Sequence, residues 1–401
     1  MRDMAATPNL PVLPFDRPSL FDPAPLLMRL QAERPVLRVR TPVGDEGWLV
    51  TGYERVRDLL GDDRLGRAHP DPDHAPRYSR AAIGGGPLGN YETERADHAR
   101  LRRLLTRNFM VKRMNALRPA IQALVDDLLD QLATRTPPVD LHAALSMPLP
   151  VLVICELLGV PYEDRDDFRR WSDDVTNMSD PHRAASGFEG LFRYMHGHVA
   201  RRHQEPGEDV ISDLVNASNP EDKTTDDEIA DLGAGLLFAG HETTMGRLDI
   251  GALLLLTHPE QRRLVERDPD AVDAAVEEIL RFGGIGPATQ IRYARADIEL
   301  EGTTIRPGDL VLLAMGAANR DEKAFPNPDD FDVQRTQNHH VTFGHGNHFC
   351  LGAGLARIEL RTGLGTLFRR FPTLELAVPL SEVRLRVDSV AEGIEALPVT
   401  W

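Results

Sequence analysis

The sequence predicts a mainly α-helical fold with small β-sheets, an α+β arrangement in one domain over residues 1–401. Strand-like alternation occurs towards both ends of the chain, whereas residues 97–201 carry several amphipathic helical patterns in succession. A longer helical segment begins after Thr225. By length alone a chain of 401 residues would be expected to form two or more domains. No Ser/Gly-rich or charged linker divides it, and we therefore expect a single domain.

The N-terminal region predicts irregular structure, then a hairpin, then a long loop. Residues 1–18 are polar and interrupted by prolines, so they are expected to be irregular. Residues 36–40 and 47–50 alternate like two strands joined by a turn, which predicts a hairpin. Residues 64–91 are rich in Pro, Asp and Gly. Long irregular stretches in compact domains are usually functional or disordered, and we predict a mobile substrate-access loop at 64–95.

The longest predicted helix lies in the middle of the chain. Thr225 and Glu228 have the spacing of a capping box, and the pattern continues to Pro259. Such a helix would be about 45–50 Å long. Its segment 232–240 is apolar on every face, as expected of a fully buried helix. A further helix is predicted at 271–282. Short strands are predicted at 291–312, a polar coil at 319–337 and strand-like structure again at 374–401.

Composition excludes several classes of function. A formal net charge of −16 argues against non-specific nucleic-acid binding and against an anionic membrane surface. The 2 cysteines form neither a disulfide framework nor a zinc-type CxxC pair. The longest apolar runs, such as 253–256, are too short to span a bilayer. We expect a soluble protein of a reducing compartment, the cytoplasm.

The first chemical motif surrounds Cys350, within the segment FGHGNHFCLG at 343–352. Gly344 and Gly346 allow the backbone to adopt φ > 0 or to approach a flat ligand closely. Helical spacing at 355–360 places Cys350 at a helix N-terminus, where free N–H groups and the helix dipole favour a thiolate. A thiolate held in this way is a candidate metal ligand. The alternative is a buried cysteine that acts as a small hydrophobic residue.

Two further motifs lie on predicted helices. Residues 239–244, AGHETT, put an acid and two hydroxyls into the buried helix, which is costly unless they are bonded or functional. Gly240 weakens the helix and permits a bulge; alternatively, the Thr hydroxyls bond back to preceding carbonyls. Glu278 and Arg281 form an i,i+3 pair, whose alternative is a solvated surface salt bridge.

Together these motifs resemble those of the cytochrome P-450 family, specifically its soluble bacterial members. The haem loop FGxGxHxCxG is matched from Phe343 to Gly352, the AGx(D/E)T motif from Ala239 to Thr243, and the ExxR pair at Glu278 and Arg281. The resemblance covers residues 25–401. It implies a triangular, helix-rich, monomeric domain that holds haem b between the long oxygen-binding helix and the helix after the cysteine. It also implies O₂ as co-substrate.

The resemblance assigns roles to individual residues. Cys350 would be the axial ligand of the iron, and Ala239 and Gly240 would leave room for O₂ while Glu242 and Thr243 manage proton delivery. The remaining haem contacts would come from the loop and from partners of the propionates, each alternatively a surface charge: Phe343, Gly344, Gly352, His98, Arg102, Arg292 and His348.

Glu278 and Arg281 are implied to be structural. In the family an arginine before the haem loop commonly joins this pair, but its most usual position here carries Asp330. We expect Arg335, a little further along the chain, to take its place. A second departure is Gly354, where many relatives have proline, and we expect it to leave the chemistry unchanged.

Electrons and substrate must come from outside the chain, which has no flavin or NAD fingerprint and no Fe–S cysteine set. By resemblance the donors are a ferredoxin and its reductase, docked on a basic patch. The patch would comprise Arg100, Arg103, Arg107, Lys112 and Arg113. The substrate pocket would be lined by small or apolar residues: Leu236, Ala239, Ile285, Ala288 and Val390.

A pocket of this character suits a hydrophobic natural product such as a macrolide, another polyketide or a terpenoid, by hydroxylation or epoxidation. One alternative is a haem-thiolate binding protein without oxygen chemistry, which would have no need of Glu242 and Thr243. Another is a non-haem metal site, for which the loop offers no carboxylate. Its ligands would be His339, His340, His345 and His348.

Overall fold

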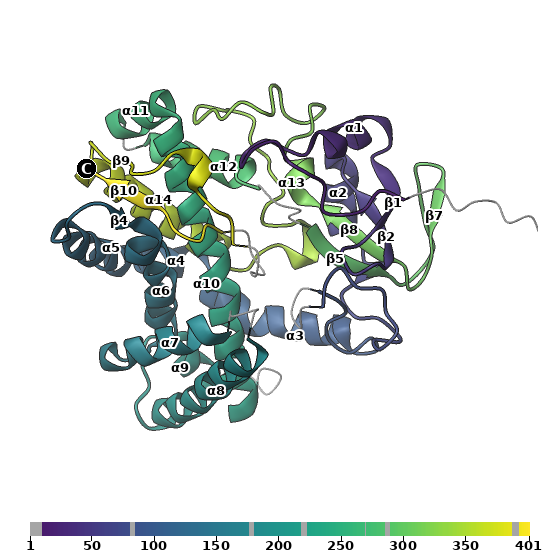
Figure 1. The fold of residues 1–401 in the computed structure, drawn as a ribbon. Coiled ribbons are helices and arrows are strands. Elements are labelled where there is room, and N and C mark those ends of the chain that lie inside the picture. The colour runs from purple at the N-terminus through teal and green to yellow at the C-terminus, as the bar shows by residue number, and fades with distance from the viewer. Residues whose placement is uncertain are drawn as a thin grey trace, which may run out of the picture. The chain divides into compact units, whose positions relative to one another are not determined.

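A computed structural model describes residues 10–80, 85–175, 180–217, 223–268, 270–284, 289–386 and 393–401 (Figure 1). The contacts divide the chain into two compact units. The sheet unit comprises Met1–Ala96, Gly284–Asp330 and His339–Phe349, and the helical unit comprises Asp97–Gly283, Phe331–Asn338 and Cys350–Trp401. The helix-rich class with small sheets is confirmed, whereas the single domain over 1–401 stays a prediction.

The sheet unit is built on a five-stranded sheet of order β1-β2-β8-β5-β3. Its strands are β1 (Val36–Arg40), β2 (Glu46–Val50), β8 (Leu310–Ala314), β5 (Thr289–Ala294) and β3 (Leu65–Gly66). The predicted hairpin is confirmed, because β1 pairs antiparallel with β2 in the register Val36↔Val50. β8 runs parallel to β2 and antiparallel to β5. Two-residue alternation explains why every residue of β8 is buried: apolar layers cover both faces of the sheet.

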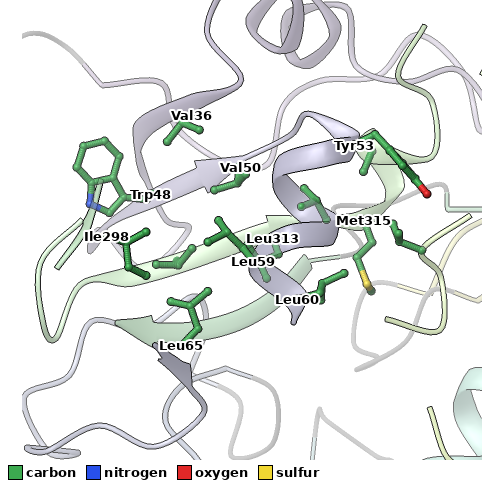
Figure 2. Close-up of a cluster of buried hydrophobic side chains, with 14 of the residues drawn as sticks. Val36, Trp48, Val50, Tyr53, Leu59, Leu60, Leu65, Ile298, Leu313 and Met315 are labelled. Atoms are coloured by element: carbon green, nitrogen blue, oxygen red, sulfur yellow. The ribbon is translucent and has the colours of Figure 1, made fainter. Parts of the chain in front are cut away.

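One layer contains α2 (Tyr53–Leu60), and Figure 2 shows its Leu59 among Val50 and Leu313 of the sheet. The opposite layer contains Leu37 and Leu49 and receives α1 (Pro25–Glu33) through Leu30. The remaining elements of the unit are α13 (Met315–Ala318) and the hairpin of β6 (Ile298–Leu300) with β7 (Thr303–Ile305).

The predicted access loop is irregular after β3 and ends where α3 begins at Glu94, two residues earlier than expected. Hydrogen bonds hold its described part in place. The Tyr293 hydroxyl donates to Pro76 O (2.8 Å), and the Arg77 N–H donates to Asp45 Oδ2 (2.8 Å). Leu88 N–H donates to Arg67 O (2.9 Å). Residues 81–84 lie outside the described part, and mobility of the loop stays a prediction.

The helical unit is a set of helices packed around α10 (Asp226–Thr257) (Figure 1). The helices before it are α3 (Glu94–Thr106, which begins in the sheet unit), α4 (Val111–Ala116), α5 (Arg118–Ala133), α6 (Pro148–Leu158), α7 (Arg165–Val175), α8 (Pro181–Gln204) and α9 (Val210–Val215). Those after it are α11 (Pro259–Arg267), α12 (Ala271–Phe282) and α14 (Ala353–Arg370). A small sheet of order β4-β10-β9 completes the unit: β4 (Val139–Asp140), β10 (Pro398–Thr400) and β9 (Glu375–Leu376).

The predicted capping box of α10 is confirmed. Thr225 Oγ1 accepts from Glu228 N–H (3.2 Å) and Glu228 Oε2 accepts from Thr225 N–H (2.8 Å). The helix is continuous, so the bulge that Gly240 would permit does not form. A Cβ on Gly240 would lie 2.8 Å from Ile154 Cδ1, and this glycine therefore permits the close approach of α6. Among the described residues a π-helical turn occurs at His142–Ser146 instead.

The coil predicted at 319–337 is free of regular helix and strand. Residues 10–18 are likewise irregular apart from an isolated bridge between Val12 and Arg40. Within the described residues, no helix combines the length and apolar character needed to cross a membrane.

Candidate functional site

The loop before Cys350 belongs to the sheet unit and needs its glycines. Gly344 has φ +77° and Gly346 has φ +67°, which confirms the predicted left-handed positions. A Cβ on Gly346 would lie 2.7 Å from Gly61 Cα, so only glycine fits against the end of α2. The Phe343 ring lies 6.3 Å from that of Phe349, centroid to centroid, with the rings tilted. The loop thus presents tightly turned backbone immediately before the cysteine.

Cys350 lies just before α14, whose N-cap is Gly352, and its side chain is exposed. Backbone N–H groups of Gly352 and Ala353 interact with the sulfur and lower the pKa of the thiol, but desolvation by the surrounding protein outweighs them and raises that pKa. The N–H groups at the start of α14 thus favour the thiolate, as predicted, but in the polypeptide alone desolvation has the larger effect on the pKa of the thiol. Cys155 in α6 is buried instead, and burial raises the pKa of its thiol to about 12.

One face of α10 is exposed in the helical unit. It carries Ala239 and Thr243, which are one turn apart, and Leu236 lies partly buried beside them. Thr243 Oγ1 donates to Ala239 O (2.9 Å), so this hydroxyl makes the back-bond considered as an alternative. Between Gly235 and Thr243 the exposed face of α10 is therefore apolar apart from one hydroxyl.

The other side of α10 is buried and polar. The side chain of Glu242 is 3% exposed, and its Oε1 lies 3.6 Å from Nη2 of Arg386, which is itself 25% exposed. Neighbouring His241 is also buried. Burial disfavours its charged ring, the nearby cations Arg386 and His142 add repulsion, and the pKa of His241 falls to about 4. His241 is therefore neutral at ordinary pH.

His142 and Asp249 form a second buried pair on this side of α10. Nδ1 of His142 lies 2.8 Å from Oδ2 of Asp249, whose side chain is 0% exposed. Neither residue, nor Arg386, was found from the sequence. Their positions are far apart in the chain, and no local spacing signals the contacts.

Among the described residues, Arg281, Asp332, Arg335 and Asn338 donate hydrogen bonds to the Glu278 carboxylate. Arg281 donates to its two oxygens (2.8 and 2.7 Å), and both side chains are 0% exposed. Nε of Arg335 lies 3.2 Å from each oxygen, and Asn338 Nδ2 and Asp332 N–H also donate (3.1 and 3.0 Å). The alternative interpretation of Glu278 and Arg281 as a solvated surface salt bridge is therefore wrong. Arg335 contacts Glu278, and Asp330 belongs to the sheet unit.

The proposed propionate partners are divided between the two units. His98 and Arg102 lie one turn apart on α3 in the helical unit and are partly exposed. Arg292 lies in β5 of the sheet unit, buried, and donates to Gln290 Oε1 (3.2 Å) and Ile291 O (2.8 Å). Burial and the charge of Arg67 lower its pKa to about 10. His348 lies in a short 3₁₀ turn of the sheet unit, partly exposed.

A buried guanidinium beside a second cation is a favourable place for a carboxylate. Sequence reasoning missed Arg67, which no motif marks. Three of the predicted pocket residues, Ile285, Ala288 and Val390, lie outside the described residues.

The alternative of a non-haem metal site in the histidine-rich loop is not supported. Among the described residues, no group of three His, Cys, Asp or Glu side chains could hold a metal ion. His339 instead stacks on Phe325 (ring centroids 4.9 Å apart) and packs edge-on to Tyr53.

The predicted basic patch is weaker than its composition suggests. Arg100 pairs with Glu228 (3.0 Å) and Arg113 pairs with Asp213. The exposed members are Arg103, Arg107 and Lys112.

Comparison with known proteins gives one family match over part of the chain and matches to relatives over nearly all of it. A family model described as cytochrome P-450 matches residues 203–381. The chain is 43% identical over 401 residues to pentalenolactone synthase of Streptomyces exfoliatus, covering 98% of this chain and 100% of that protein. It is 42% identical over 375 residues to the mycinamicin IV hydroxylase/epoxidase of Micromonospora griseorubida, covering 93% and 94%.

Solved structures agree in fold. A point mutant of the mixed-function P-450 MycG in complex with mycinamicin V has a TM-score of 0.89 at 40% identity, covering 98% of this chain and 100% of that one. The LnmA P-450 hydroxylase of the leinamycin pathway of Streptomyces atroolivaceus has a TM-score of 0.88 at 38% identity, with the same coverage.

Replacing Glu278 by Gln should lower the free energy of unfolding by about 3–5 kcal/mol, because it leaves two buried arginines without their anion. The neighbouring Glu277, which pairs with the partly exposed Arg357, is a matched control, and Glu277→Gln should cost about 0–1 kcal/mol. Thermal unfolding of the purified proteins measures both. Equal costs would contradict the assignment of Glu278 as the central buried acid.

Acid should destabilise the protein through His241. The pKa of this ring is about 4 in the folded state and about 6.5 when unfolded, so its contribution is complete above pH 6.5 and is lost as pH falls towards 4. Relative to His241→Gln, the wild-type protein should lose about 3 kcal/mol between pH 7 and pH 4. Denaturant titrations at several pH values measure the difference, and a pH-independent difference would show that His241 is not held neutral.

Proposed function

Because this chain belongs to the cytochrome P-450 family and is a monooxygenase of that family, we propose that it oxidises a hydrophobic natural product, using electrons from a ferredoxin and its reductase. The observation that carries the proposal is the exposed Cys350 thiol. It follows two left-handed glycines and precedes the N-terminus of α14. Buried Cys155, the other cysteine, is not accessible to a metal.

The residues present fit a haem b. Cys350 would be the axial ligand, and coordination to a metal deprotonates a thiol outright, which offsets its raised pKa. The left-handed backbone at Gly344 and the turns at Phe343 and Gly352 suit a flat cofactor. The propionate partners would be His98, Arg102, Arg292 and His348. When bound, the haem supplies O₂ activation, and thiolate ligation favours O–O cleavage.

The polypeptide would hold and move protons. Thr243 presents a hydroxyl, able both to donate and to accept, on the exposed face of α10. Glu242 precedes it on the buried side and would supply protons across the helix through ordered water. Ala239 and Gly240 add no bulk beside this hydroxyl, which would leave room for O₂.

Glu278 and Arg281 would act structurally. Their hydrogen bonds hold segment 331–338 against α12, and this segment otherwise has no helix or strand to fix it. We propose that the arrangement keeps the chain that leads to the cysteine loop in one conformation.

The substrate would be a macrolide, another polyketide or a terpenoid, modified by hydroxylation or epoxidation. Support comes from the relatives, whose names include a mycinamicin hydroxylase/epoxidase and a pentalenolactone synthase. Leu236 and Ala239 on α10 would face it, together with Ile285, Ala288 and Val390. An acidic ferredoxin would dock on the exposed Arg103, Arg107 and Lys112, and we expect the enzyme to act as a monomer.

The reduced, carbon-monoxide-bound protein should show the strongly red-shifted Soret band of a thiolate-ligated haem. Cys350→Ser should lose that band, because a serine hydroxyl does not replace the thiolate. Cys155→Ala, which removes the buried thiol, should retain it. If the folded wild-type protein instead gave the spectrum of a histidine-ligated haem, the proposal would be contradicted.

Thr243→Ala should uncouple electron consumption from product by roughly tenfold, with peroxide released, because a proton-handling hydroxyl is lost. Thr257 makes the same kind of back-bond to Leu253 O (2.8 Å) at the other end of α10, so Thr257→Ala is a matched control. Product and peroxide per electron pair are the measurements. Full coupling in Thr243→Ala would remove the role given to this hydroxyl.

A further inference from the structure

A cluster of ionisable side chains lies on the buried side of α10 in the helical unit. We call it the His142 cluster. Three members are on α10 itself, one begins the π-helical turn and one is in the C-terminal segment: His241, Glu242, Asp249, His142 and Arg386. π-helical turns are rare and are often found at functional sites. The relay proposed above uses Glu242 but leaves the rest of this cluster without a role.

Arg386 is fixed in position close to Glu242. Its backbone N–H donates to Gly393 O (3.0 Å), next to a bridge between Leu385 and Ile394. Its side chain reaches Met245 Sδ (3.8 Å) and Glu242 Oε1 (3.6 Å) while remaining 25% exposed. The buried acid is therefore connected to a side chain that solvent reaches.

His142 holds a proton more strongly than an ordinary histidine. Burial lowers the pKa of its ring, but the hydrogen bond and charge of Asp249 outweigh burial and raise it. The other charged groups that act on the ring are Asp140, which favours the proton, and Arg386, which opposes it. Because Nδ1 faces Asp249, Nε2 is the ring nitrogen left to exchange a proton.

Arg386 couples the two pairs electrostatically. Its charge acts on His142 and on His241, and it forms the ion pair with Glu242. His241 is neutral and does not compete for the proton. The side chain of His142 is 11% exposed, so its ring can take up a proton from solvent. The side chain of Glu242 is 3% exposed and has little direct contact with solvent.

We propose that Arg386, His142 and Asp249 are positioning residues for Glu242. Arg386 holds the Glu242 carboxylate in place. The His142–Asp249 pair stores a proton, and this proton replaces the one that Glu242 donates in each turnover. The proton leaves Nε2 of His142, reaches a Glu242 oxygen through water beside Arg386, and the neutral ring regains a proton from solvent. No bond other than N–H and O–H is made or broken. The inference rests on the proposed monooxygenase function.

The first test is the titration of His142 itself, by NMR of the haem-loaded protein labelled with ¹⁵N-histidine. The ring should titrate above the ordinary histidine pKa of about 6.5 in the wild type and shift downwards in Asp249→Asn. An ordinary or lowered pKa in the wild type would overturn the proposal without any activity measurement.

The second test compares turnover of the haem-loaded enzyme. In His142→Gln, product formed per electron pair should fall by up to about tenfold, and the solvent isotope effect on turnover should rise. In Asp249→Asn the decline of coupling with rising pH should move to lower pH, because the pKa of His142 is no longer raised. Arg386→Lys should retain coupling that Arg386→Gln loses.

The control is His198→Gln on α8, since His198 is also buried but its ring nitrogens contact Leu158 O (Nε2, 2.9 Å) and Arg201 Nη2 (Nδ1, 3.4 Å). Its pH profile and isotope effect should match the wild type. If His142→Gln and Asp249→Asn lower the unfolding temperature but leave both readouts unchanged, the pair is only structural and the proposal fails. Each variant's carbon-monoxide spectrum separates that failure from failure of the proposed function, because the thiolate band persists in the former.

Discussion

The buried carboxylate of Glu278 is the interaction on which the helical unit most depends. An isolated buried anion would cost several kcal/mol, and here Arg281 and Arg335 compensate it while Asn338 and a backbone N–H complete its hydrogen bonds. Three of these donors come from segment 331–338, which has no backbone ladder of its own. The chain before and after this segment belongs to the sheet unit. One acid on α12 therefore fixes a part of the chain that secondary structure does not.

α10 separates two environments. On one face Ala239 and Thr243 are exposed and the single hydroxyl is bonded back to the helix. On the other, Glu242, His241 and the His142–Asp249 pair are buried. A helix that is apolar by composition can carry this cluster only because its ionisable groups pair with one another or stay neutral. Because Gly240 has no side chain, α6 packs closely against α10 and helps to bury this side of the helix.

Much of this could be predicted because the signals are local. The 271–282 helix and the start of α10 follow from periodicity and a capping box, and the Cys350, Thr243 and Glu278 motifs are runs of neighbouring residues. What failed depends on tertiary surroundings. The helix terminus acts on Cys350 as expected, but desolvation outweighs it. Arg67, His142 and Arg386 were missed because their partners are distant in the chain. Arg100 was predicted to be part of a basic patch, but its charge is paired with Glu228.

The sheet of β4, β10 and β9 has a consequence for how the chain folds as it is made. β4 pairs with β10, and Leu397 N–H donates to Asp140 Oδ1 (2.8 Å) although the two residues are 257 positions apart. Domains begin to fold during synthesis, but a strand whose partner is still untranslated has to wait. The segment that leads into His142 thus acquires its final backbone pairing only after residues 398–400 have left the ribosome. Until then α5 and α6 are joined by a connection whose geometry is not yet set.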